Sequence, residues 1–357
     1  RWKRRGAWFA FCARYYSLRM KFVFADWARR RCARFFRRQA GGMGKRLCAV
    51  ALLLLGAEAW AKPRVIVSTD IGGSDPDDYQ SMVHYLVYAD RFDTEGLISS
   101  PPHAGRVDSI LECLDAYAAD YPELRKRSEE YPEPDALRAV ARQGATEPQA
   151  AERPESLSEG ARLIVERARA EDSRPLYVLV WGSMTDVAQA LHADPSIASK
   201  LRVYSIGSWN TRQDELSRQY VYDNYKELWW IENDTTFRGM YLDAPEEGEL
   251  SNLGFTEAHV SGHGALGALF MAKMPKIKMG DTPSVLYLLH GAPDWPSVPS
   301  WGGAFVRPDA ASRPRYWTDD PQAELAIGDK PGAKTVSRWR EAYLRDWEER
   351  MDRAKPE

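Results

Sequence analysis

The sequence predicts an α/β protein: a single domain with a doubly wound, mostly parallel sheet and helices on both of its faces. Two observations favour this fold class. From residue 62 onward, short apolar runs rich in β-branched residues alternate with longer stretches of helical periodicity. Repeated strand–turn–helix order is typical of parallel strands joined by right-handed crossovers. The 296 residues from Lys62 are enough for one large domain.

The elements follow in chain order. We expect strands at 64–69, 92–98, 176–181 and 201–206. We expect helices at 79–88, 107–119, 158–170, 184–191 and 336–351. Residues 120–155 are rich in Pro, Glu and Arg and are expected to be irregular, while 281–314, rich in Pro, Gly and Trp, are expected to form a long loop after one helix.

The first 61 residues are not expected to belong to the folded domain. Residues 1–42 hold 13 Lys and Arg against one acid, and we interpret them as a non-native upstream extension, the alternative being a basic arm. Residues 43–61 have a charged start, an apolar core and an Ala-Trp-Ala end, which predicts a signal peptide cleaved near Ala61 and a protein that is periplasmic or secreted. Eleven apolar residues cover about 16 Å of helix, too short for a stable membrane span.

Charge and cysteine content exclude several classes of function. From Lys62 onward the chain has 34 basic and 49 acidic residues, a balance that argues against nucleic-acid binding. Only Cys113 lies in this part, which excludes a disulfide scaffold and a cysteine-rich zinc site there. Composition leaves a homo-oligomer open.

An acidic cluster follows the first predicted strand. Asp70 stands at the strand end, and Asp75, Asp77 and Asp78 gather at the start of the next helix. In doubly wound sheets, ligands bind at the carboxyl ends of the strands. Carboxylates this close repel one another, and a hard dication such as Ca²⁺ would relieve the repulsion. The alternative is a solvated acidic turn in which Asp77 or Asp78 only caps the helix.

This segment, Val-Ser-Thr-Asp-Ile-Gly-Gly-Ser-Asp-Pro-Asp-Asp, resembles the Asp-x-Asp-Pro-Gly-x-Asp-Asp motif of nucleoside hydrolases. It is still more similar to the exported nucleoside hydrolase-like family described from a cellulose-binding protein. Further stretches that resemble signatures of that family are 174–191, 231–241, 279–284 and 300–303. The resemblance implies a nucleoside hydrolase-like domain at 62–320, followed by a C-terminal tail and helix at 321–357.

The resemblance also implies roles for individual residues. A Ca²⁺ ion would be held by three carboxylates and one backbone carbonyl, those of Asp70, Asp78, Asp281 and Trp181. Asp70 would in addition take a proton from the attacking water. Asp77 would bind a ribose hydroxyl and Asn210 the sugar. By position alone, His103 follows the second strand and is a further candidate for substrate binding. The implied activity is Ca²⁺-dependent hydrolysis of a glycosidic bond, of N-ribosyl type, in a small sugar or nucleoside.

Two departures from the nucleoside hydrolase pattern favour an alternative. Gly280 stands where those enzymes commonly have a histidine, and Ser68 replaces the first motif aspartate. The alternative is a carbohydrate-binding protein that keeps the fold without catalysis. A Mg²⁺-dependent phosphatase is disfavoured, since no basic residue lies between Arg64 and Arg91. A Gly-x-Gly-x-x-Gly string at 262–267 follows no clear strand and therefore does not predict a dinucleotide site.

Overall fold

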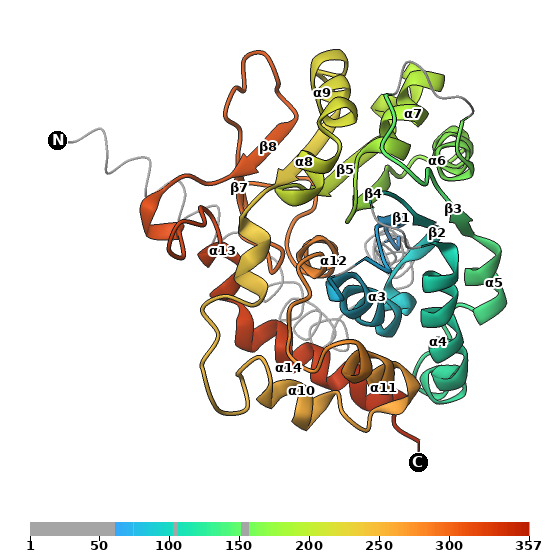
Figure 1. The fold of residues 1–357 in the computed structure, drawn as a ribbon, viewed down its shortest axis with the longest axis vertical. Coiled ribbons are helices and arrows are strands. Elements are labelled where there is room, and N and C mark those ends of the chain that lie inside the picture. The colour runs from blue at the N-terminus through green and yellow to red at the C-terminus, as the bar shows by residue number, and fades with distance from the viewer. Residues whose placement is uncertain (1–60, 74, 103–105, 151–156, 357) are drawn as a thin grey trace, which may run out of the picture. The chain divides into compact units, whose positions relative to one another are not determined.

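One mixed sheet organises the protein. The computed structural model describes residues 61–73, 75–102, 106–150 and 157–356, and Lys62–Glu357 form one compact unit. The strands are β1 (Arg64–Thr69), β2 (Asp93–Ser99), β3 (Ala141–Gln143), β4 (Leu176–Val180), β5 (Leu201–Ile206), β6 (Trp229–Asn233), β7 (Phe305–Val306) and β8 (Tyr316–Asp319). Their spatial order is β3-β2-β1-β4-β5-β6-β8-β7, and every pair is parallel except β7–β8 (Figure 1). The predicted fold class is confirmed.

Helices connect the strands. They are α3 (Asp77–Val87), α4 (Val107–Arg127), α5 (Pro134–Ala139), α6 (Glu159–Arg169), α7 (Thr185–Ala193), α8 (Trp209–Gln213), α9 (Glu215–Asn224), α10 (Gly254–His259), α11 (Gly264–Lys273), α12 (Thr282–Leu289), α13 (Lys334–Ser337) and α14 (Arg340–Met351). Short 3₁₀ turns lie at η1 (Ala89–Arg91), η2 (Pro195–Ser199), η3 (Thr236–Met240), η4 (Ala323–Leu325) and η5 (Asp352–Ala354).

The sheet has a hydrophobic core on each face. Successive side chains of a strand point to opposite faces, so Val65 and Val67 of β1 join one core and Ile66 joins the other. The first core takes in residues of α3, α4, α11, α12 and α14, and the second takes in residues of α6, α7 and α9. Figure 1 shows α3 and α12 on one side of the central strands and α6 and α7 on the other. Parallel strands buried on both faces explain the continuous apolar runs in the sequence.

The expectation that 120–155 is irregular was wrong in part. Helix α4 continues to Arg127 with Pro122 inside it, and α5 and β3 follow. Tertiary packing explains this extension: α4 packs against α11, with Leu124 buried in the core, and burial outweighs the weak helical signal of the segment. The sequence patterns also did not predict β6, β8 or the helices α9 to α11.

Three expectations concern residues that the structure does not describe. The upstream extension at 1–42, nearly all of the signal peptide at 43–61, and His103 lie outside the described residues. Within the described part of the chain, no helix combines the length and apolar character needed to cross a membrane.

Candidate functional site

A pocket of about 270 Å³ lies at the carboxyl ends of the central strands. Its walls come from the turns that follow β1, β4, β5 and β6 and from the start of α12. The residues that line it are Asp70, Asp75, Asp77, Asp78, Trp181, Ile206, Gly207, Ser208, Trp209, Asn210, Phe237, Arg238, Tyr241, Lys278 and Asp281. Five of these side chains are carboxylates, and two are cations. The sheet topology therefore brings Asp281 to the acidic cluster that follows β1. Both lie at the carboxyl ends of parallel strands, where ligands bind in such sheets.

Three carboxylates approach one another inside this pocket. Oxygens of Asp77, Asp78 and Asp281 all lie within 4.8 Å of one another. The first two come from the first turn of α3, and Asp281 comes from the start of α12, which packs against α3. Asp281 occupies the N-cap position of α12, yet its side chain makes no capping hydrogen bond. Its Oδ2 atom is buried without any hydrogen-bond partner in the described structure.

Burial and mutual repulsion disfavour the charged forms of these acids. Burial raises the pKa of Asp70 to about 7, although a hydrogen bond with Asp78 opposes the rise. The pKa values of Asp77, Asp78 and Asp281 lie well above the usual range, first because of burial and then because of neighbouring carboxylates. Thr69 donates a hydrogen bond to Asp78 Oδ1, which orients that carboxylate. In the absence of a cation, these four acids must bind protons to relieve the repulsion between them.

The donor set fits a hard divalent cation. It consists of carboxylate oxygens only, one of them unsatisfied, and a dication would remove the repulsion that raises the pKa values. Lys278 does not do this for the whole cluster, because its ammonium pairs with Asp75 at the edge of the pocket. Oxygen ligands of this kind suit Ca²⁺ or Mg²⁺ rather than zinc or copper.

Trp181 and Asn210 lie beside the acids and are joined to each other. The Asn210 amide donates to the Trp181 carbonyl at 2.6 Å and to the Ile206 carbonyl at 3.2 Å. The Trp181 carbonyl retains a second lone pair, so the expected metal contact stays open to it. The Trp181 indole donates to Ser284 of α12 at 2.8 Å, which ties the end of β4 to the helix that carries Asp281.

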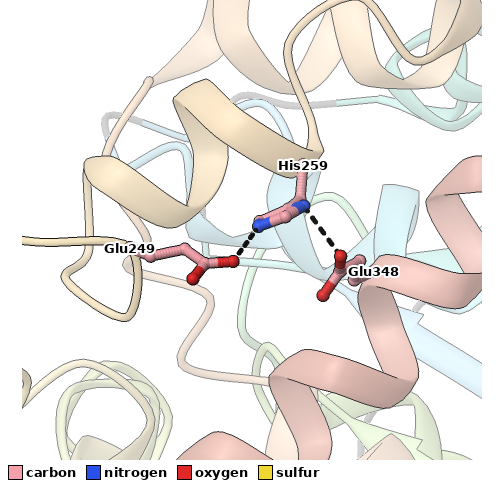
Figure 2. A group of neighbouring side chains, drawn as sticks. All are labelled: Glu249, His259 and Glu348. Atoms are coloured by element: carbon pink, nitrogen blue, oxygen red, sulfur yellow. Dashed lines mark hydrogen bonds and ion pairs between the residues drawn. The ribbon is translucent and has the colours of Figure 1, made fainter.

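A second group of possible metal ligands is already satisfied. Glu249, His259 and Glu348 place three ligand atoms within 4.8 Å of one another. Figure 2 shows both ring nitrogens of His259 facing a carboxylate, Glu249 at 2.7 Å and Glu348 at 3.2 Å. Arg345 pairs with both carboxylates and, with His259, lowers the pKa of Glu249 to about 2. These groups neutralise one another, unlike the acids of the pocket, and form a surface ion-pair network.

The sequence analysis assigned no role to several residues of the pocket. Trp209, Phe237, Arg238, Tyr241 and Lys278 line it without having been assigned a role. Trp209 follows closely after β5, so the rule that strand ends carry function could have found it. The stretch 231–241 was singled out as a family signature, but nothing in its pattern indicated which side chains face the ligand.

The described lining contains no histidine. His290 stacks on Trp301 with ring centroids 4.6 Å apart, and His263 contacts the Ser261 carbonyl at 2.9 Å; neither lines the pocket. The pocket therefore offers no described imidazole as the acid for a leaving group.

The glycine-rich string at 262–267 has a structural role. Gly264 has a φ of 71°, and a Cβ atom there would lie 2.5 Å from the carboxylate of Asp120. That carboxylate accepts the N–H groups of Ala265 and Leu266 at 2.7 and 2.8 Å. Asp120 of α4 thus caps the start of α11, where a dinucleotide site would need an open helix end.

Comparison with known proteins shows which family the fold belongs to. The family model for the nucleoside hydrolase-like domain of cellulose-binding Sde182 matches residues 64–305. The chain belongs to this family. Among solved structures, this Sde182-like protein resembles a nucleoside hydrolase-related hypothetical protein from Saccharophagus degradans that is associated with carbohydrate metabolism. The TM-score is 0.64 and the identity 26%, over 83% of this chain and 72% of that one. No curated protein matches the chain.

More distant structures share the fold alone. The effector protein XOO4466 has a TM-score of 0.51 at 13% identity, over 88% of this chain and 99% of that one. The type III effector XopQ, solved in complex with adenosine diphosphate ribose, has a TM-score of 0.50 at 14% identity, over 86% and 97%.

Proposed function

We propose that this Sde182-like protein is an exported, Ca²⁺-dependent hydrolase of glycosidic bonds, of the N-ribosyl type. The observation that carries the proposal is the convergence of buried acids from α3 and α12, with Asp281 Oδ2 left without a partner. Asp70 and Asp78 are 5% exposed and Asp281 is 3% exposed, so water cannot compensate their charge. A carboxylate cluster that served only to cap a helix would not need an aspartate from a distant helix.

The proposed roles follow from position. Two of the three clustered acids, Asp78 and Asp281, would hold the ion together with the Trp181 carbonyl and Asp70, which lies outside that group of three but is hydrogen-bonded to Asp78. When bound, the ion would orient water and sugar hydroxyls and lower the pKa of the water. Asp70 accepts the proton of the water that attacks the anomeric carbon, which is the task of a general base. Asp77 binds a hydroxyl of the sugar, and no covalent intermediate is needed.

The activity test is a panel of nucleosides and aryl glycosides incubated with the protein, with Ca²⁺ and with chelator. We expect release of free base or aglycone only with Ca²⁺, and loss of at least 100-fold in rate for Asp70→Asn. The matched control is Asp223→Asn, which removes an exposed carboxylate of α9. Product release that is insensitive to chelator, or to the Asp70 substitution, would contradict the assignment.

A carbohydrate-binding protein without catalysis is the second candidate. The observation that favours it is the described pocket lining, which lacks a histidine to protonate a leaving group and has Gly280 beside Asp281. Trp209 is 52% exposed at the pocket and offers a ring face on which a sugar can stack. Ca²⁺-dependent binding of a sugar, with no product from any member of the panel, would favour this candidate.

A further inference from the structure

Among the described residues, the pocket contains a guanidinium that forms no ion pair with a carboxylate, that of Arg238, although its charge lowers the pKa of Asp329. Arg238 lines the pocket together with five aspartates, yet among the described residues no carboxylate oxygen lies within 4.0 Å of its nitrogens. We propose that the substrate is an anionic glycoside whose carboxylate or phosphate group binds Arg238. This inference rests on the proposed function in one respect, namely that the acidic side of the pocket receives the sugar.

Neutral groups hold Arg238 in place. Its Nη1 donates to the Tyr241 hydroxyl at 3.0 Å and its Nη2 to the Ser208 hydroxyl at 3.3 Å. Its Nε is buried and has no hydrogen-bond partner in the described structure. An unsatisfied donor on a charged group is costly, and an anion accepting from Nε would remove that cost. The other pocket cation, Lys278, is already paired with Asp75.

The position of Arg238 suits a group attached to the sugar. Its guanidinium carbon lies 4.9 Å from the centre of the Phe237 ring. The same ring lies near Asp77, because a Cβ atom built at Gly280 would be 3.2 Å from Phe237 Cδ2 and 3.0 Å from Asp77 Oδ2. Phe237 thus links the sugar-binding acids to the cation. A ligand that places a hydroxyl on Asp77 can extend an anionic substituent past this ring to Arg238.

The backbone fixes one of the groups that orient Arg238. Ser208 has a φ of 59°, a conformation that residues other than glycine rarely adopt, and its N–H donates to Asp234 at 2.7 Å. Strained backbone of this kind is concentrated at ligand sites. Arg218 shows the contrasting case: it pairs with Glu232 at 2.6 Å and has a structural role.

The test compares charged and neutral ligands by calorimetry on the full chain with Ca²⁺. The pairs are ribose 5-phosphate against ribose and glucuronate against glucose. In at least one pair, we expect the anionic sugar to bind at least 10-fold more tightly than the neutral sugar. The pair with the larger difference shows whether Arg238 prefers a phosphate or a carboxylate. Arg238→Gln should abolish the preference and leave the affinity for the neutral sugar within about twofold. Arg238→Lys, which keeps the charge, should retain part of the preference.

The matched control is Arg162→Gln, which removes an exposed guanidinium of α6 that is outside the pocket lining. This variant should keep the full preference. Equal affinity for both members of both pairs, no binding of any of the four sugars, or a preference that survives in Arg238→Gln overturns the inference. Failure of the proposed function gives a different result: the anion preference persists while no glycoside is cleaved.

Discussion

At the scale of single residues, the site depends on acids that are placed where charge is unfavourable. Asp78 and Asp281 are buried, and burial raises the pKa of both; the Asp70 carboxylate raises the pKa of Asp78 further, and the Asp78 carboxylate that of Asp281. Folded proteins keep such groups only when a proton, a hydrogen bond or a metal compensates the charge. A shared cation explains both the burial and the unpaired Asp281 oxygen; a solvated turn explains neither.

The raised pKa of Asp70 predicts how stability depends on pH. The pKa is about 7 in the folded protein and 3.8 in the unfolded chain, so the folded state binds the proton more tightly. The free energy of unfolding without metal should therefore fall as the pH rises from about 4 through 7, on the order of a few kcal/mol. Urea denaturation with chelator at pH 5, 6, 7 and 8 measures this decline.

Ca²⁺ should offset that loss most strongly at pH 8, where the carboxylates are ionised. In Asp70→Asn, the decline with pH should be smaller. If the free energy of unfolding instead rises steadily with pH in the absence of metal, ionisation of these acids does not destabilise the folded protein.

At the scale of elements, the start of α12 depends on a glycine. A side chain at Gly280 would crowd both Asp77 and the Phe237 ring, as the distances of 3.0 and 3.2 Å from a Cβ atom show. The absence of a side chain thus lets α12 bring Asp281 close to α3.

Gly280→Ala should weaken ligand binding without unfolding the protein. The added methyl group must displace Asp77 or Phe237 by a few tenths of an ångström, which should lower sugar affinity about 5-fold and cost roughly 1 kcal/mol of stability. Calorimetry with the preferred sugar and urea denaturation measure the two effects. An unchanged sugar affinity would mean that Asp77 does not contact the ligand.

Sequence patterns predicted the central elements more reliably than the periphery. β1 and β5 have the predicted bounds because their apolar runs are buried on both faces. The end of α4 depends on contacts with α11, far away in the chain, and no local pattern reports such contacts.

The same division holds for the site. Asp70, Asp77, Asp78, Trp181, Asn210 and Asp281 were chosen from motifs, and all of them line one pocket. Their individual roles stay predictions. Arg238 and Tyr241 were not chosen, because their significance arises from which groups surround them in space. That Arg238 bonds to hydroxyl groups and to no described carboxylate is a property of the folded structure and has no signature in the sequence.

At the scale of the whole molecule, the C-terminal helix belongs to the compact unit that carries the site. α14 packs against α3, and Trp347 is buried in the larger core. Arg350 of α14 pairs with the buried Asp90 at 2.7 Å, shortly after the end of α3. The helix that presents Asp77 and Asp78 is therefore supported from the far end of the chain.

Arg350→Ala should destabilise the whole unit. Removing one partner leaves Asp90 buried without its main counter-charge, for which we expect a loss of about 3 kcal/mol in the free energy of unfolding. Equilibrium urea unfolding measures the change. The control is Arg353→Ala, whose longer contact of 3.3 Å with Asp90 is more exposed and should cost less than about 1 kcal/mol. Equal losses in the two variants would contradict the role given to Arg350.

The most direct test of the account is Ca²⁺ binding by Asp281→Asn, measured by calorimetry beside the wild type and Asp223→Asn. The substitution keeps the size of the side chain and removes one charge from the group that α3 and α12 build together. We expect the wild type and the control to bind one Ca²⁺ with the same affinity, and the Asp281 variant to bind at least 100-fold more weakly. Unchanged affinity in that variant, or no Ca²⁺ binding by the wild type, would contradict the shared metal site.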